Sequence, residues 1–143
     1  MAVPLLALIA ATLFAGAALY ISLVEHPVRL RLDDASVLAQ WQPSYKAALP
    51  IQSGLAVVGG VLGLIAGYQT QDWRWVAGSF VLLGNSPFTL IAIMPTNKRL
   101  MNMSVADAGA ENRQLLQRWG RLHSVRSALG SESRSRAAGS CSS

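Results

Sequence analysis

Three long stretches of the sequence contain no charged residue, and most of their positions are apolar. They run from Met1 to Val24, from Ala47 to Gln71 and from Trp75 to Thr96. About 20 apolar residues in a helix cross a hydrocarbon core of about 30 Å, and a charged residue at its centre costs about 2.5–3.5 kcal/mol. The pattern therefore predicts an all-α, integral membrane helical bundle with three spans, at about residues 4–24, 51–68 and 75–94.

Composition and charge agree with a membrane protein. Only 13% of the 143 residues are charged, against about a quarter in soluble domains. The first span is not read as a signal peptide, because it lacks a basic start and is followed by Glu25-His26-Pro27 rather than by small residues. The net charge of +5 comes mostly from residues that flank the spans. We therefore expect the lipid bilayer, and not a nucleic acid, as the partner.

The segments outside the spans predict surface elements. Residues 33–45 have an acidic start and helically spaced apolar residues, which predicts a short interfacial helix. Residues 106–129 predict a helix on the cytoplasmic surface. Residues 130–143 are rich in Ser, Arg, Gly and Ala and predict a disordered tail. Residues 1–129 would then form the one folded domain.

The distribution of basic residues predicts an orientation. Arg29, Arg31 and Lys46 follow the first span, and a second basic region begins with Lys98 and Arg99 after the third span. Two spans separate these regions, so they lie on one side of the membrane. The positive-inside rule places that side in the cytoplasm and the N-terminus outside.

A stripe of glycines runs along one face of the second span. Gly59, Gly63 and Gly67 recur every four residues and share one helix face. Small residues in this spacing let a second helix approach closely in lipid. The stripe predicts a homo-oligomer, although glycine is also simply tolerated in membrane helices.

Candidate chemistry gathers at the predicted cytoplasmic face. Span counting brings Glu25, His26, Asn97, His123 and Arg126 to this one face. A histidine can remove a proton near neutral pH, Glu25 could orient it, and Arg126 or Asn97 could stabilise an enolate or phenolate oxygen. A metal held by His26, His123 and Glu25 is a second interpretation. The third is that these side chains only face headgroups or pack on a neighbouring helix.

Polar residues also lie in the middle of the third span. Asn85 and Thr89 flank Pro87, which removes a backbone hydrogen bond. Polar groups at this depth need internal partners. They either line a cavity for a flat apolar substrate or bond to a neighbouring helix, and Tyr20 of the first span is a candidate partner.

Several short motifs, taken in order, resemble the anthrone-oxygenase-like family, also described as domain of unknown function 1772. The motifs are Gly16-Ala17-Ala18-Leu19-Tyr20 before Glu25-His26-Pro27, Trp41 to Lys46, Pro87-Phe88-Thr89 with Pro95-Thr96-Asn97, and Trp119 with His123 and Arg126. The resemblance covers about residues 6–129. It implies a four-helix membrane protein, and some members oxidise anthrones to anthraquinones without a common organic cofactor.

The resemblance also defines residues to examine and one departure. It points to Glu25, His26, Asn97, Trp119, His123 and Arg126. The family pattern continues into a fourth apolar span, whereas the chain after Leu129 is polar. This predicts a truncation or a shifted reading frame, or else a natural three-span form.

These observations lead to one functional prediction and its rivals. We expect a membrane-embedded oxygenase that oxidises a hydrophobic phenolic or polyketide-like substrate by His-assisted deprotonation and addition of O₂, with no cofactor. His26, His123, Glu25 and Arg126 would be catalytic, and Asn97, Trp119, Asn85, Thr89 and Tyr20 would bind the substrate. The alternative is a non-catalytic membrane subunit or scaffold. A transporter is less favoured, because the spans show no repeat and no paired charges.

Overall fold

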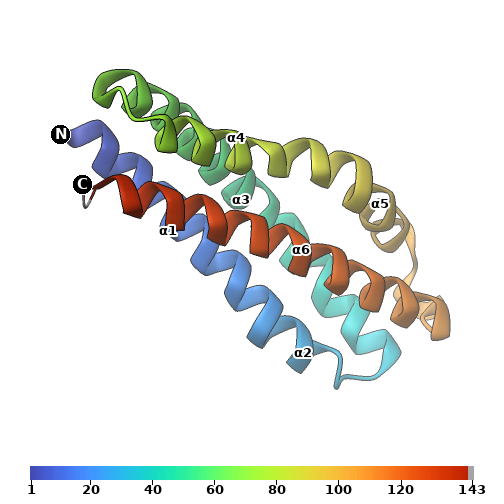
Figure 1. Cartoon of the computed structure of the whole chain (residues 1–143). Helices are drawn as coiled ribbons and strands as arrows, with labels where there is room; N and C mark the ends of the chain where they lie inside the picture. Colours follow the sequence, from blue (N-terminus) through green and yellow to red (C-terminus); the bar gives the residue numbers. More distant parts are fainter. Residues whose placement is uncertain (142–143) are drawn as a thin grey trace.

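The computed structural model describes residues 1–141 and the side chains of residues 1–128, and all regular secondary structure in this part of the chain is helical. Its helices form four rods (Figure 1). The first rod joins α1 (Ala2–Tyr20), the π-helical turn η1 (Ile21–Glu25) and α2 (His26–Arg29). The second is α3 (Asp34–Thr70). The third joins α4 (Trp73–Phe88), the π-helical turn η2 (Thr89–Ile93) and α5 (Met94–Asn102). After a short 3₁₀ turn, η3 (Val105–Asp107), the fourth rod is α6 (Ala110–Cys141).

The four rods pack as a closed ring. The α1 helix contacts α3 and α6, and α4 contacts the same two helices from the other side. Figure 1 shows α6 returning along the bundle, so that both chain ends lie at the same end of the molecule. The opposite end carries the α2–α3 and α5–α6 connections.

The outer surface of the bundle identifies its solvent as lipid. Large apolar side chains are exposed along three of the rods, among them Leu5, Ile9, Leu13, Val57, Val58, Val61, Ile65, Phe80, Leu90 and Ile91. A soluble monomer rarely exposes so continuous an apolar surface. Within the described residues, the first three rods are also long and apolar enough to cross a membrane. The predicted all-α membrane bundle and its three spans are confirmed, and each rod extends beyond the span predicted for it.

Small residues close the half of the bundle near the chain ends. A Cβ atom on Gly59 would lie 3.0 Å from a methyl carbon of Leu82, and one on Gly67 would lie 2.7 Å from a methyl carbon of Val76. A Cβ atom on Gly63 would overlap the Ser79 hydroxyl. The glycine stripe therefore packs against α4 within the chain. Its neighbours are thus side chains of the same chain, and the homo-oligomer stays a prediction.

Larger side chains fill the other half of the bundle. Its buried core consists of Val37, Leu38, Trp41, Ile93, Leu100, Leu115, Leu116 and Trp119. Helices that carry such residues are held further apart than helices in contact through glycine. The candidate site lies in this wider half.

The second rod differs from its prediction. The sequence predicts a separate interfacial helix before the second span, but α3 continues from Asp34 to Thr70 through Pro43 and Pro50. Proline inside a membrane helix is tolerated where neighbouring groups satisfy the freed backbone carbonyls. The predicted start is confirmed, because the Asp33 side chain caps α3 by accepting hydrogen bonds from the backbone N–H groups of Ala35 and Ser36.

The fourth rod also differs from its prediction. The sequence predicts a cytoplasmic surface helix at about 106–129 and a disordered tail from 130, whereas α6 continues to Cys141 and packs on α1 and α4. Residues 142–143 of the predicted tail lie outside the described residues. The helix packs into the bundle because it has a buried face, which includes Asn112, Leu116, Trp119, His123 and Ser127. This face makes α6 part of the bundle.

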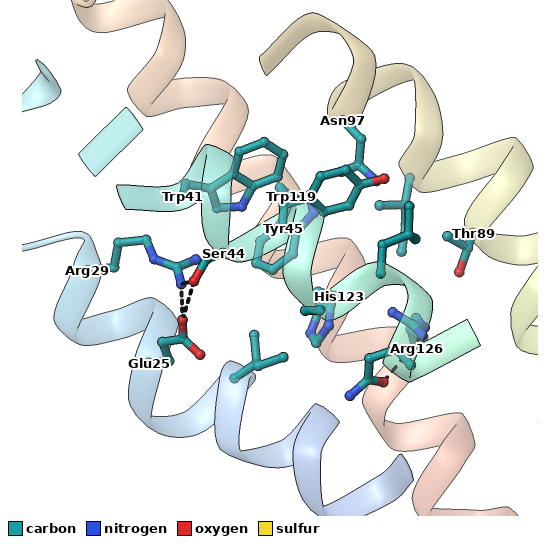
Figure 2. A pocket seen from close by; sticks show the side chains of 15 residues that line it. Glu25, Arg29, Trp41, Ser44, Tyr45, Thr89, Asn97, Trp119, His123 and Arg126 are labelled. Atoms are coloured by element: carbon teal, nitrogen blue, oxygen red, sulfur yellow. Dashed lines mark hydrogen bonds and ion pairs between the residues drawn. The ribbon is translucent and has the colours of Figure 1, made fainter. Parts of the chain in front are cut away.

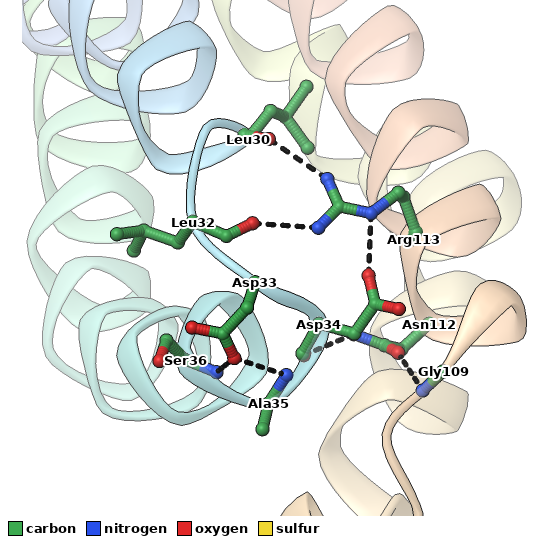
Figure 3. A network of polar contacts seen from close by, with 9 residues as sticks. All are labelled: Leu30, Leu32, Asp33, Asp34, Ala35, Ser36, Gly109, Asn112 and Arg113. Atoms are coloured by element: carbon green, nitrogen blue, oxygen red, sulfur yellow. Dashed lines mark hydrogen bonds and ion pairs between the residues drawn. The ribbon is translucent and has the colours of Figure 1, made fainter.

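A polar network joins the start of α6 to the α2–α3 connection (Figure 3). The Arg113 guanidinium donates to the carbonyl oxygens of Leu30 at 2.9 Å and Leu32 at 2.7 Å, and to the Asp34 carboxylate at 2.5 Å. The Asn112 amide donates to the Asp34 carbonyl at 2.9 Å. These bonds fix the register of α6 against the first two rods, and therefore the height at which Trp119 and His123 enter the bundle.

Candidate functional site

A cavity of about 70 Å³ lies in the wider half of the bundle, between all four rods. This volume is enough for several water molecules or for part of a larger ligand. The lining combines aromatic, charged and apolar side chains (Figure 2). It consists of Ile21, Glu25, Arg29, Trp41, Ser44, Tyr45, Ala48, Leu49, Gln52, Thr89, Ile93, Asn97, Trp119, His123 and Arg126.

Both π-helical turns contribute to this lining. The η1 turn supplies Ile21 and Glu25, and η2 supplies Thr89 and Ile93. Each turn ends two residues before a proline, Pro27 or Pro95. A proline ring clashes with the carbonyl of the residue four positions earlier, and a wider turn relieves that clash. The prolines of the sequence thus explain why the two rods widen beside the cavity.

His123 lies in the centre of the site, on the buried face of α6 (Figure 2). The Ser22 hydroxyl lies 3.0 Å from its Nδ1, and the Ser127 hydroxyl lies 3.4 Å from the same nitrogen. The two serines are 2.9 Å apart, and Ser127 also donates to the Ala18 carbonyl at 3.1 Å. One nitrogen of the ring is therefore anchored to the first rod. The other, Nε2, makes none of these bonds and is the nitrogen available to a ligand.

An aromatic wall forms one side of the cavity. Trp41 and Tyr45 stack with ring centroids 4.9 Å apart, and Trp119 meets Trp41 edge-on at 5.7 Å. Trp119 also stacks on the His123 ring at 4.7 Å. The Tyr45 hydroxyl accepts a hydrogen bond from the Asn97 amide at 3.0 Å. Such a wall offers flat faces to a planar aromatic ligand.

Several polar groups of the cavity residues have no partner among the described residues. They are the indole N–H groups of Trp41 and Trp119, the Nε atoms of Arg29 and Arg126, and the side-chain oxygen of Asn97. Buried polar groups are normally hydrogen-bonded, and an unsatisfied one costs about 1–3 kcal/mol. The site therefore presents four unmet donors and one unmet acceptor to a ligand that carries oxygen.

Two arginines add positive charge on opposite sides of the cavity. Arg126 donates to the Gln52 side chain at 3.4 Å, and its guanidinium carbon lies 5.2 Å from the centre of the Phe14 ring. Arg29, which is 5% exposed, pairs with the Glu25 carboxylate. The Ser44 hydroxyl also donates to Glu25, at 3.1 Å. Arg29 is thus neutralised by its partner, whereas no carboxylate of the described residues pairs with Arg126.

Comparison with known proteins identifies the family. A family model described as "Anthrone oxygenase" matches residues 41–131, which is more than half of the chain. The chain belongs to the anthrone oxygenase family. The matched range includes Trp41, Tyr45, Asn97, Trp119 and His123, so the family match covers most of the cavity lining. The resemblance predicted from the motifs is confirmed.

Individual relatives of the family agree over most of the chain. An "Anthrone oxygenase" of Claviceps purpurea is 28% identical over 89% of this chain and 81% of its own length. "Anthrone oxygenase tpcL" of Aspergillus fumigatus is 30% identical over 85% and 81%, and "Anthrone oxygenase dmxR16" of a Cryptosporiopsis species is 31% identical over 79% and 70%. No solved structure matches the chain. The relatives support an oxygenase-like function.

The structure gathers six of the predicted site residues in the cavity. Glu25, Thr89, Asn97, Trp119, His123 and Arg126 all line it. Tyr20 is 58% exposed and does not line it, because its side chain lies on the outer face of the first rod. Asn85 is buried one helical turn before Thr89 and borders a neighbouring cavity.

His26 is close to the site but outside it. Its ring packs against Trp119 with centroids 5.0 Å apart and fits over Gly120 of α6. Glu25 is occupied by Arg29 and Ser44. The described residues include no group of three His, Cys, Asp or Glu side chains placed to hold a metal. His26, His123 and Glu25 are therefore not assembled as the ligand set considered from the sequence.

Sequence reasoning missed several residues of the site. Ser22 and Ser127 hold His123, and Arg29, Ser44 and Tyr45 line the cavity. One signal for Arg29 was available, because Glu25 and Arg29 are four residues apart on a helix, as ion pairs often are. No local pattern marks the serines, since their role depends on contact between two distant helices.

Proposed function

We propose that the protein is a membrane-embedded oxygenase that converts a hydrophobic phenolic substrate of the anthrone type to the corresponding quinone. The support comes from one arrangement: an imidazole anchored through Nδ1, with its Nε2 available beside an aromatic wall and several unmet hydrogen-bond donors. The relatives' names give the substrate class for those proteins, and we extend it to this chain as a proposal.

In the proposed reaction, the chain's own groups handle the proton and the developing charge. Nε2 of neutral His123 removes a proton from the methylene carbon of the anthrone, and the electron pair of that bond moves toward the carbonyl oxygen. The indole N–H groups and Arg126 surround the cavity and stabilise the resulting enolate oxygen. Arg126 adds a positive charge that strengthens this effect in a site of low dielectric.

Molecular oxygen then adds to the carbanion carbon. A C–O bond forms to give a peroxide anion, which takes a proton from the His123 imidazolium and becomes the substrate hydroperoxide. Loss of water breaks the O–O bond and removes the second methylene hydrogen, which leaves a carbonyl. One oxygen atom of O₂ thus ends in the quinone and the other in water. The substrate is oxidised by four electrons, so the reaction needs no other reductant or oxidant.

The test compares the two histidines. Protein purified in mild detergent is given an anthrone, and oxygen uptake and quinone absorbance are recorded against a protein-free blank. We expect His123→Gln to lower kcat by roughly 10²–10⁴, the usual contribution of a general base. His26→Gln, a change of the same type outside the cavity, should retain most of the activity. Equal activity of His123→Gln and the wild type would refute the assigned base, and wild-type turnover at the blank rate would favour a non-catalytic subunit.

We also propose that the wider end of the bundle faces the cytoplasm, with the chain ends outside. The support is the charge distribution, because Arg31, Lys98 and Arg99 lie near the wider end whereas Arg74 lies near the chain ends. The test uses single cysteines placed at Ser104 or Gln71 in a Cys141→Ser background. A membrane-impermeant maleimide added to intact cells should label Gln71→Cys and not Ser104→Cys. The reverse labelling would overturn the orientation.

A further inference from the structure

A second cavity, of about 240 Å³, adjoins the first between α3 and the α4–η2 rod. The two cavities share Leu49, Thr89 and Arg126 in their linings. On its outer side the second cavity reaches Leu90, which is 62% exposed on the apolar surface. It therefore lies between the proposed reaction site and the lipid.

Two polar groups that line this cavity are buried without a partner, the Nε of Arg126 described above and the side-chain oxygen of Asn85. Asn85 is 1% exposed, and its side-chain N–H donates to the Val81 carbonyl at 3.2 Å. Only the amide nitrogen can donate to a carbonyl, so the geometry fixes the side-chain oxygen on the other side. That oxygen has no hydrogen-bond partner in the described part of the chain. It can accept a hydrogen bond and cannot donate one.

The other polar atoms nearby do not satisfy this oxygen. The Thr89 hydroxyl donates to the backbone carbonyl of Asn85 at 2.7 Å and is thereby directed to the helix backbone. Ser53, Ser86 and Arg126 also line the cavity, but none of them bonds the Asn85 side-chain oxygen. A ligand that meets this site needs an apolar body and a hydrogen-bond donor.

We propose that this second cavity is a subsite for the outer, hydroxylated ring of a flat polycyclic phenol, and that Asn85 accepts a hydrogen bond from the hydroxyl of that ring. The inference rests on the proposed function, because the reacting ring would occupy the first cavity beside His123. Thr89 and Arg126 border both cavities, so one rigid ring system can extend from one to the other. A site built to bond a substrate hydroxyl rejects the analogue that lacks it, because its own polar group is then left unpaired.

Binding rather than turnover tests the subsite. Trp41 and Trp119 line the first cavity, so quenching of their fluorescence reports occupancy by an anthraquinone that does not react. Two probes are compared: unsubstituted anthraquinone and one with a hydroxyl on an outer ring. For the wild type we expect the hydroxylated probe to bind roughly tenfold more tightly. In Asn85→Leu, which keeps the size but removes the acceptor, the ratio of the two Kd values should fall to about one.

Ser79→Ala is the matched control. Ser79 is a buried polar residue on α4 that bonds the Trp75 carbonyl and does not line the second cavity, so this variant should keep the wild-type ratio. If Asn85→Leu does not fold, Ser53→Leu narrows the cavity from its exposed side and should weaken binding of the hydroxylated probe roughly tenfold. An unchanged ratio in folded Asn85→Leu, or unchanged affinity in Ser53→Leu, overturns the subsite. Absence of anthrone turnover by the wild type overturns the proposed reaction. The ratio of the two Kd values then decides the subsite independently of turnover.

Discussion

Gly120 is the residue of α6 over which the His26 ring is seated, and replacing it with alanine is the sharpest perturbation that the structure offers. A Cβ atom at this position would lie 2.6 Å from His26 Cδ2, about 0.8 Å inside the ordinary limit of 3.4 Å, and would overlap Nε2 as well. The imidazole is 6% exposed and has Trp119 against it. Gly120→Ala must therefore push the ring against the wall of the cavity.

The expected magnitude follows from two opposing effects. Overpacking a filled site costs about 1–3 kcal/mol, whereas replacing glycine by alanine within a helix gains about 0.5–1 kcal/mol. We expect Gly120→Ala to lower the free energy of unfolding by about 0.5–2 kcal/mol. Since Trp119 also lines the cavity, displacement of His26 should lower the affinity for a planar ligand.

The assay is a double-mutant cycle measured by unfolding in mixed micelles of mild detergent and dodecyl sulfate. Gly120→Ala, His26→Ala and the double variant are compared with the wild type. Once His26 is truncated, the alanine at position 120 meets no ring, so the double variant should recover the cost of the clash as a coupling of about 1–3 kcal/mol, because the helix gain is the same in both backgrounds. Gly54→Ala is the control, because nothing lies within 4 Å of its Cβ position. It should be neutral or slightly stabilising.

Strict additivity of the two single changes would refute the reasoning. It would mean that the His26 ring does not rest on Gly120. A loss of stability in Gly54→Ala equal to that in Gly120→Ala would point to a general effect of alanine at helical glycines, and the contact would again not be the cause.

Three further predictions concern the frame around the site. Gly63→Ala should destabilise the bundle by about 0.5–2 kcal/mol through overlap with Ser79, and unchanged thermal unfolding in detergent would contradict the close packing. Arg113→Ala removes bonds to two carbonyls and a carboxylate, so it should cost about 1–3 kcal/mol in the same measurement, whereas exposed Arg118→Ala should not. Hydrogen bonds from Ser36 lower the pKa of Asp33 below 3.8, so the stability that the cap contributes is present above the ordinary pKa and is lost as the pH falls through the lowered one. The Asp33→Asn variant still caps the helix, so its unfolding temperature should fall less on acidification than that of the wild type. An identical acid profile for the two proteins would count against the cap.

The spans were predictable because each depends on a local property, the absence of charge over a membrane-spanning length. Lipid imposes this requirement on every exposed position of a helix, so a span can be recognised from a run of consecutive residues. The helix start at Asp33 was predictable for the same reason, since a cap acts over three residues.

The place of α6 was not predictable by that rule. Arg118 and Arg121 are exposed on it, and their charges favour a surface helix. What brings α6 into the bundle is its polar buried face, where Asn112 reaches the Asp34 carbonyl and Ser127 reaches the Ala18 carbonyl. These partners lie far away in the sequence. The hydropathy of the α6 residues shows that the face is polar, but it does not show that the side chains have hydrogen-bond partners.

The same limit explains the partial success with the site. Topology alone placed Glu25, Asn97 and His123 near one another, and they do share the cavity. Topology also grouped His26 with them, but residues adjacent on a helix diverge by about 100°. That rotation directs Glu25 to the cavity and His26 to Gly120. Choosing between the two histidines required the contacts of each ring.

The helices are in close contact in one half of the bundle and held apart in the other, and this difference accounts for the cavity. Close contact at Gly59, Gly63 and Gly67 holds α3 and α4 together near the chain ends. At the other end, the wide turns before Pro27 and Pro95 and the indoles of the core keep the rods apart. Close contact at one end limits how far the rods can shift at the other, because each rod is an unbroken run of helical residues. A cavity lined by unmet polar groups can then persist without collapsing, because the tight half holds the wide half open.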